Sequence, residues 1–172
     1  MVLIGLFTEL AKHPECIDKC YAELKDVNVA DQKTLAKLPH LNAVILETMR
    51  LYPALMTGGS RKTGMHGITV AGKFIPPHTT IVAPQYVITR SESPQFIALL
   101  SPHPAHSPPP TGEDCFEQPL DFVPERWTTR REMVRDSTAS TPFGTGRYNC
   151  IGRTLAMNIM RYVVARLLQS YT

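Results

Sequence analysis

The sequence predicts a mainly α-helical fold with a small antiparallel β-sheet. Three segments with apolar residues at helical spacing come first, short β-branched runs around a glycine follow, and a long helical segment ends the chain. The chain has 172 residues, of which 43% are apolar and 19% are charged. That length and composition are enough for one ordinary globular domain with a core.

Prolines mark the limits of the first three predicted helices. The first helix stops near His13-Pro14, the second begins at Pro14, and the third runs over residues 40–52 until Pro53 ends it. In the second helix we expect Lys19, Glu23 and Lys25 to point outward. The inward stripe of that helix is predicted to be Ile17, Cys20, Tyr21 and Leu24.

The middle of the chain changes character. Residues 68–75 predict two short strands about a glycine turn, and residues 79–82 predict another strand. Residues 93–113 contain six prolines and no charged residue before Glu113. A structureless loop longer than about 12–15 residues is uncommon inside a compact domain. We therefore expect residues 93–113 to be an insertion, either a retained intron or a disordered loop.

A last long helix is predicted from Gly152 onward. Its expected apolar positions are Leu155, Ile159, Val163 and Leu167.

Composition excludes several classes of protein. The formal net charge is +3 and no basic stripe is present, so we do not expect nucleic-acid binding. The four cysteines follow no secretory signal, and the chain is too long to need a disulfide framework. No stretch approaches the roughly 20 apolar residues that span a bilayer, which favours a soluble or peripheral chain.

The stretch from Phe143 to Gly152 carries the clearest chemistry. Gly144 and Gly146 allow a tight turn and a close approach to a flat ligand. Cys150 comes just before a long helix, where free N–H groups and the helix dipole favour a thiolate. A thiolate is the axial ligand that favours O–O cleavage at haem iron. Phe143 can shield the sulfur, and Gly152 leaves room for a ring.

This stretch resembles the cysteine loop of the cytochrome P450 superfamily, Phe-Gly-x-Gly-x-Arg-x-Cys-x-Gly. All fixed positions match except Tyr148, where the family usually has a basic residue that pairs with a haem propionate. The resemblance implies that Cys150 is the haem iron ligand and that Phe143 shields it. It also implies that Gly144, Gly146, Arg147 and Gly152 contact the haem, with Arg147 substituting for the displaced basic residue.

Further motifs occur in the family's order. Residues 46–53 resemble the K helix, and residues 122–127 resemble the segment that contains Pro-Glu-Arg-Trp. The resemblance implies a buried cluster of Glu47, Arg50 and Arg126, which would serve folding and haem loading. It further implies that Arg61, before the predicted hairpin, binds a haem propionate.

The resemblance covers residues 1–172 apart from 93–113 and implies the C-terminal part of a cytochrome P450 domain. The expected fold is a partial one, with the J and K helices, the β1 hairpin region, the cysteine loop and the L helix. The sequence is similar to fungal-type microsomal members. The family's membrane anchor, its oxygen-handling threonine and most substrate-recognition loops have no counterpart here.

The implied function is O2-dependent oxidation of a small organic substrate with haem b. Electrons would come from NADPH–cytochrome P450 reductase or a similar donor. Relatives of this type are anchored in the endoplasmic reticulum membrane and face the cytosol. Whether this chain is an enzyme in isolation stays open. One alternative is a truncated, non-catalytic remnant of such an enzyme. Another is a small metal-binding module, although Cys16 and Cys20 lack the two-residue spacing of zinc knuckles.

Overall fold

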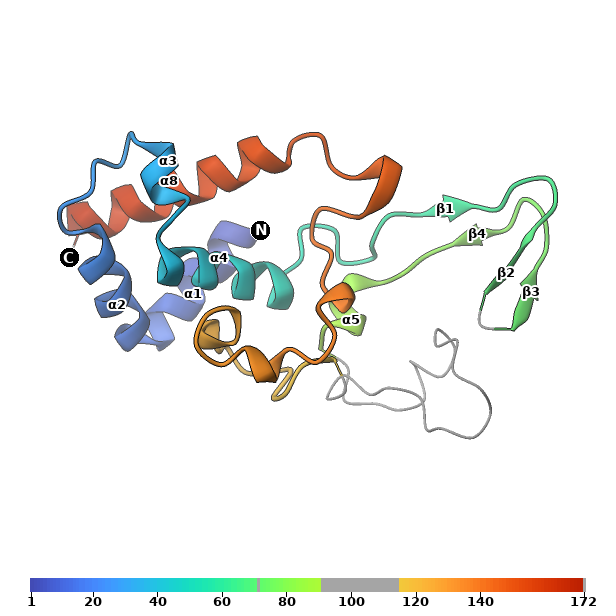
Figure 1. Cartoon of the computed structure of the whole chain (residues 1–172), viewed down its shortest axis with the longest axis horizontal. Helices are drawn as coiled ribbons and strands as arrows, with labels where there is room; N and C mark the ends of the chain where they lie inside the picture. The colour runs from blue at the N-terminus through green and yellow to red at the C-terminus, as the bar shows by residue number, and fades with distance from the viewer. Residues whose placement is uncertain (71, 91–114, 172) are drawn as a thin grey trace. The chain divides into compact units, whose positions relative to one another are not determined.

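The computed structural model describes residues 1–70, 72–90 and 115–171 of the chain (Figure 1). The expected insertion at residues 93–113 therefore lies outside the described residues. The fold is mainly α-helical with two small antiparallel sheets. The chain divides into two compact units. The first comprises Met1–Ala54, Phe122–Glu132 and Phe143–Thr172, and the second comprises Leu55–Asp121 and Met133–Pro142.

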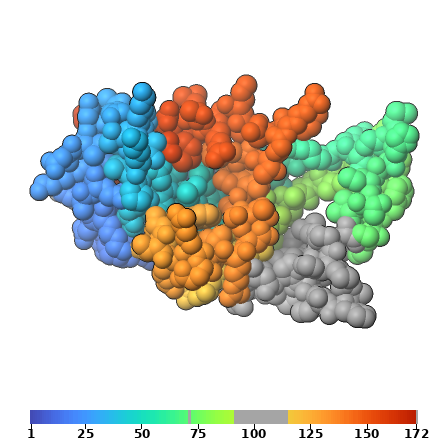
Figure 2. Space-filling view, viewed as in Figure 1, coloured from blue at the N-terminus to red at the C-terminus, as the bar shows by residue number. Residues whose placement is uncertain are grey.

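The first unit is a bundle of helices. Its members are α1 (Val2–Lys12), α2 (Pro14–Leu24), α3 (Gln32–Leu35), α4 (Pro39–Leu51) and α8 (Arg153–Tyr171), with the short 3-10 helices η1 (Pro124–Trp127) and η4 (Gly146–Tyr148). The surfaces of α2 and α3 adjoin that of α8 in the space-filling view (Figure 2). None of the described helices is both long enough and apolar enough to cross a membrane.

The helix starts follow from proline and from one carboxylate. Pro14 and Pro39 occupy the first turns of α2 and α4, where a missing N–H costs nothing. Glu23 was expected to point into solvent, but it is partly buried and caps α4. Its two carboxylate oxygens accept the N–H groups of His40 at 2.8 Å and Leu41 at 2.9 Å. The outward prediction was wrong because these two donors have no partner within their own helix.

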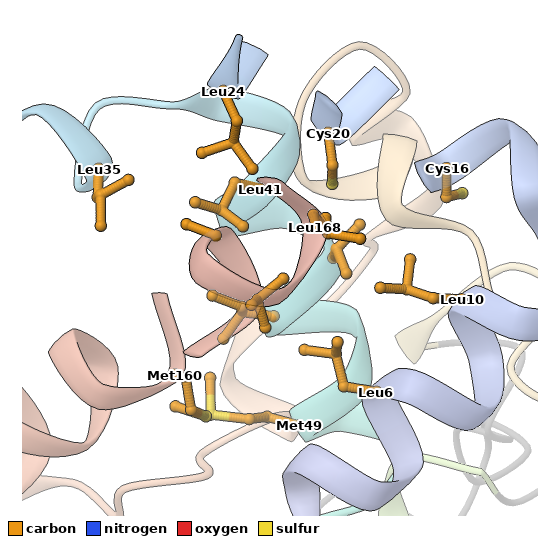
Figure 3. Packing of buried hydrophobic residues seen from close by; sticks show 14 of the residues in the cluster. Leu6, Leu10, Cys16, Cys20, Leu24, Leu35, Leu41, Met49, Met160 and Leu168 are labelled. Carbon is orange, nitrogen blue, oxygen red and sulfur yellow. The ribbon is translucent and has the colours of Figure 1, made fainter. Parts of the chain in front are cut away.

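The core of the first unit joins all four long helices. Leu6 and Leu10 of α1 meet Met49 of α4 and Met160 of α8 in one cluster (Figure 3). In α2 the buried stripe is Cys16, Cys20 and Leu24, whereas Tyr21, expected inside, is 36% exposed. The α2 prediction was therefore displaced around the helix for two of its four members, since Ile17 is only partly buried.

The buried face of α8 also differs from the predicted one. The helix buries Met160, Val164, Ala165 and Leu168. The predicted positions include Leu155 and Ile159, which are 65% and 48% exposed. Both sets repeat every four residues, so periodicity alone cannot choose between them. Packing against α2, α3 and α4 selects the second set. Polar contacts fix the choice, since Arg161 Nε donates to Asn42 Oδ1 at 2.7 Å.

The second unit contains the strands. β1 (Arg61–Lys62) pairs antiparallel with β4 (Thr80–Ile81), and β2 (Ile68–Val70) pairs with β3 (Lys73–Ile75) about the predicted glycine turn. Gly72 in that turn has a φ of 74°, which favours glycine. The short helix α5 (Gln85–Ile88) and the 3-10 helix η3 (Ser137–Ala139) also belong here. The 3-10 helix η2 (Arg131–Met133) spans the point where the chain passes from the first unit to the second.

Candidate functional site

Cys150 lies in the first unit, three residues before the first residue of α8. Its backbone N–H donates to the carbonyl oxygen of Phe143 at 2.8 Å, which closes the loop between the two residues. Its own carbonyl accepts the N–H of Arg153 at 3.3 Å, so the loop leads directly into the helix. The thiol is free and exposed. A reactive sulfur is thus presented to the surroundings by a tightly held turn.

The glycines of the loop are required by its geometry. Gly144 and Gly146 both have a φ of 70°, a left-handed conformation that other residues rarely adopt. A Cβ at Gly146 would meet nothing within 4 Å, and a Cβ at Gly152 would lie 3.7 Å from the sulfur of Cys150. The space beside the sulfur is therefore open. Phe143 is partly buried and packs against the core of the first unit.

The other three cysteines are unsuited to binding a metal from outside. Cys16, Cys20 and Cys115 are buried. Burial, with help from Glu125, raises the pKa of the Cys16 thiol to about 11. Burial raises the pKa of Cys20 to about 12. Both residues therefore stay protonated at neutral pH, whereas metal ligation needs a thiolate. Cys150 is the one exposed cysteine of the four.

A second feature of the first unit is a buried charge cluster around Glu47. The side chains of Glu47, Arg50 and Arg126 are all 0% exposed. Glu47 Oε1 accepts Arg50 Nη2 at 2.8 Å and Arg126 Nε at 2.9 Å, and Oε2 accepts Arg50 Nε at 3.0 Å. The structure thus brings together the three residues that the motifs pair, although 79 positions separate Glu47 from Arg126.

The same carboxylate also holds the segment that carries Arg126. The backbone N–H of Val123 donates to Glu47 Oε1 at 3.0 Å, and the indole N–H of Trp127 donates to Oε2 at 2.9 Å. Lys19 Nζ adds an ion pair with Glu125 at 2.6 Å. Motifs did not indicate the roles of Val123 and Lys19. The Trp127 contact could have been anticipated, because a buried indole N–H needs an acceptor.

The two candidate propionate-binding arginines fall in different units. Arg147 is in the first unit, exposed, with its guanidinium carbon 5.9 Å from the ring centre of Tyr148. Arg61 is in the second unit, in β1, where its side chain donates to the carbonyl of Ser60 at 3.0 Å. The contacts of both residues with a haem stay predictions.

The surroundings of Cys150 fit a flat apolar cofactor with one thiolate ligand. The sulfur is exposed, the space beside Gly146 is open, and the apolar side chains of Ile151 and Leu155 are 104% and 65% exposed. These neighbours offer an apolar surface beside a single sulfur donor. In contrast, no three histidine, cysteine, aspartate or glutamate side chains gather in a way that could hold a metal ion within residues 1–70, 72–90 and 115–171.

Comparison with known proteins identifies the family. The family model described as "Cytochrome P450" matches residues 1–94 and 111–172. This chain therefore belongs to the cytochrome P450 family. Proteins of this family use haem b, whose iron is bound by the protein.

Curated relatives from fungi align with nearly the whole chain. The chain is 37% identical to tryprostatin B 6-hydroxylase of Aspergillus fumigatus, over 98% of this chain and 27% of that protein. It is 32% identical to cytochrome P450 monooxygenase nodW of Hypoxylon pulicicidum, over 98% of this chain and 29% of that protein. It is 35% identical to cytochrome P450 monooxygenase sthD of Phaeosphaeria nodorum, over 96% of this chain and 31% of that protein. The chain thus spans less than a third of the length of these relatives.

Proposed function

We propose that this chain is the thiolate-bearing part of a haem monooxygenase. The observation that carries the proposal is the position of Cys150, an exposed sulfur held in a glycine turn directly before α8. The family and the names of the relatives, which are hydroxylases and monooxygenases, support the same function.

Each residue of the loop has a distinct part in this proposal. Cys150 Sγ binds the haem iron, and when bound, a thiolate-ligated haem supplies the chemistry that cleaves O2 and oxidises an organic molecule. Gly144 and Gly146 let the backbone approach the ring, and Phe143 keeps water from the sulfur. Arg147 and Arg61 offer guanidinium groups to the propionates, whose carboxylates suit them.

The Glu47 cluster has a positioning role in the proposal. It holds the segment from Val123 to Trp127 against α4 through one carboxylate. A buried charge without its partners is costly, so this segment folds in one arrangement only. We propose that this arrangement is needed before haem is taken up.

The wider proposals follow from the family. The whole enzyme would oxidise a small organic molecule, receive electrons from NADPH–cytochrome P450 reductase or a similar donor, and be anchored in the endoplasmic reticulum membrane facing the cytosol. We also propose that residues 93–113 are an insertion from a retained intron. The match of the family model, which stops at residue 94 and resumes at residue 111, supports this. Spliced messages that retain the whole stretch would contradict it.

A second candidate is a non-catalytic remnant of such an enzyme. The observation in its favour is that the chain spans only 27–31% of the relatives named above. A remnant would keep the core of the first unit and the Glu47 cluster while binding haem poorly or not at all.

One spectrum separates the candidates. The purified chain is mixed with haemin, reduced and exposed to carbon monoxide, and the Soret band is recorded. We expect the red-shifted band of a thiolate ligand for the wild type and for the control Cys115→Ala, and its loss in Cys150→Ser. Absence of haem uptake by the wild type supports the remnant. A Cys150→Ser variant that keeps the red-shifted band contradicts the ligand assignment. Stoichiometric zinc in the purified chain would favour a metal-binding module instead.

A further inference from the structure

Helix α8 carries an apolar stripe that nothing in the described residues covers. Leu155, Ile159 and Tyr162 repeat at intervals of four and three residues, so they share one face of the helix. Their exposed fractions are 65%, 48% and 43%. The opposite face, with Met160 and Val164, is buried in the core of the first unit. The helix is therefore packed on one side and apolar on both.

Helix α1 shows the same arrangement in the same unit. Leu6 and Leu10 are buried, while Ile4 is 74% exposed. The outer face forms a shallow groove of about 750 Å³, lined by Leu3, Ile4, Phe7, Thr8, Ala11 and Lys12. Soluble monomers rarely expose extended apolar surfaces unless something binds there. Two such faces on one unit indicate a missing partner.

Length and charge identify the partner. The relatives named above carry more than two thirds of their length in regions that this chain does not match. A second copy of this chain is a poor occupant. Its own rims are basic, with Lys12 beside the α1 groove and the exposed Arg166 beside the α8 stripe, so like charges would meet in a symmetric dimer.

We propose that the outer faces of α1 and α8 bind, as a separate polypeptide, the part of a cytochrome P450 chain that this chain lacks. This chain would then be one component of a two-chain assembly. The inference depends on family membership and not on haem ligation by Cys150. It therefore differs in its test from the proposed function.

Co-expression tests the assembly. The tagged 172-residue chain is co-expressed with tryprostatin B 6-hydroxylase of Aspergillus fumigatus cut to remove the stretch that this chain matches. The positive control replaces this chain with that removed stretch. We expect a one-to-one complex, measured by size-exclusion chromatography with light scattering. Complex formation should persist in Cys150→Ser, which separates this inference from the haem proposal.

Substitutions on the two faces make the test specific. Ile4→Asp and Ile159→Asp place a charge on each proposed face at exposed positions, so the isolated chain should keep its helical circular dichroism. Each should weaken the complex at least tenfold. Tyr171→Asp is the matched control, because Tyr171 is 85% exposed on α8 but lies about 160° around the helix from Leu155.

Three outcomes would overturn the inference. The first is recovery of the tagged chain alone while the positive control yields a complex. The second is a complex that Ile4→Asp and Ile159→Asp leave as tight as Tyr171→Asp does. The third is a dimer of the chain by itself that the two substitutions dissociate, which would assign the faces to a second copy.

Discussion

Replacing Glu47 with glutamine should destabilise the first unit far more than removing one of its cationic partners. The carboxylate of Glu47 accepts hydrogen bonds at both oxygens from five donors, carried by Arg50, Val123, Arg126 and Trp127. A glutamine keeps one oxygen and turns the other into an NH2 group. That group would face donors in either orientation of the amide, and two buried guanidinium groups would lose their counter-charge.

The magnitudes follow from this count. Removing one partner from a buried ion pair costs about 3–5 kcal/mol, because the remaining charge stays buried without compensation. Arg126→Met is milder. It leaves Glu47 paired one to one with Arg50 and removes a guanidinium whose burial lowers the pKa of Arg126. The loss is then one hydrogen bond to a charged group, about 1.5–3 kcal/mol. Folded domains have only about 5–15 kcal/mol in total.

Urea unfolding measures both variants. The fluorescence of Trp127, the single tryptophan, reports on the cluster itself, and circular dichroism reports on the helices. Lys19→Met is the control, because the Lys19 side chain is 52% exposed in its pair with Glu125 and the change should stay within about 1 kcal/mol. The reasoning fails if Glu47→Gln unfolds within 1 kcal/mol of the wild type, or if Arg126→Met is the more damaging change.

Three further predictions concern local packing and pH. Gly5→Ala should cost about 1–3 kcal/mol by urea unfolding, since its Cβ would lie 2.7 Å from Cγ of Tyr52, and an unchanged midpoint would contradict the packing. Glu9 is buried, which raises its pKa, but hydrogen bonding led by Tyr52 outweighs this and keeps the pKa below 4.5. The resulting stabilisation is complete above about pH 4.5 and is lost as the pH falls, so Tyr52→Phe should flatten the acid limb of stability against pH, and equal slopes would refute it. Gly58→Ala should disrupt the second unit, because its Cβ would lie 2.0 Å from the carbonyl oxygen of Ala83 at a φ of 70°; unchanged proteolysis and circular dichroism would argue against this.

Local chemistry explains which parts of the fold could be predicted. Pro14 ends one helix and begins another through its fixed φ and missing N–H, and Pro53 follows α4 by two residues. The turn at Gly72 and the loop around Cys150 depend on positive φ values that glycine permits. The short helices α3 and α5 were not predicted, because four residues are too few to show a period.

The sequence by itself therefore determined the helical character, the limits set by proline and the presentation of Cys150, since each depends on residues close together in the chain. Only the tertiary structure decided which stripe of α8 is buried, because Leu155 and Met160 belong to two apolar faces of one helix. It also decided that Glu23 caps α4, which depends on a carboxylate 17 residues from His40. Contacts between distant residues depend on how whole helices pack, and local propensity carries no information about that arrangement.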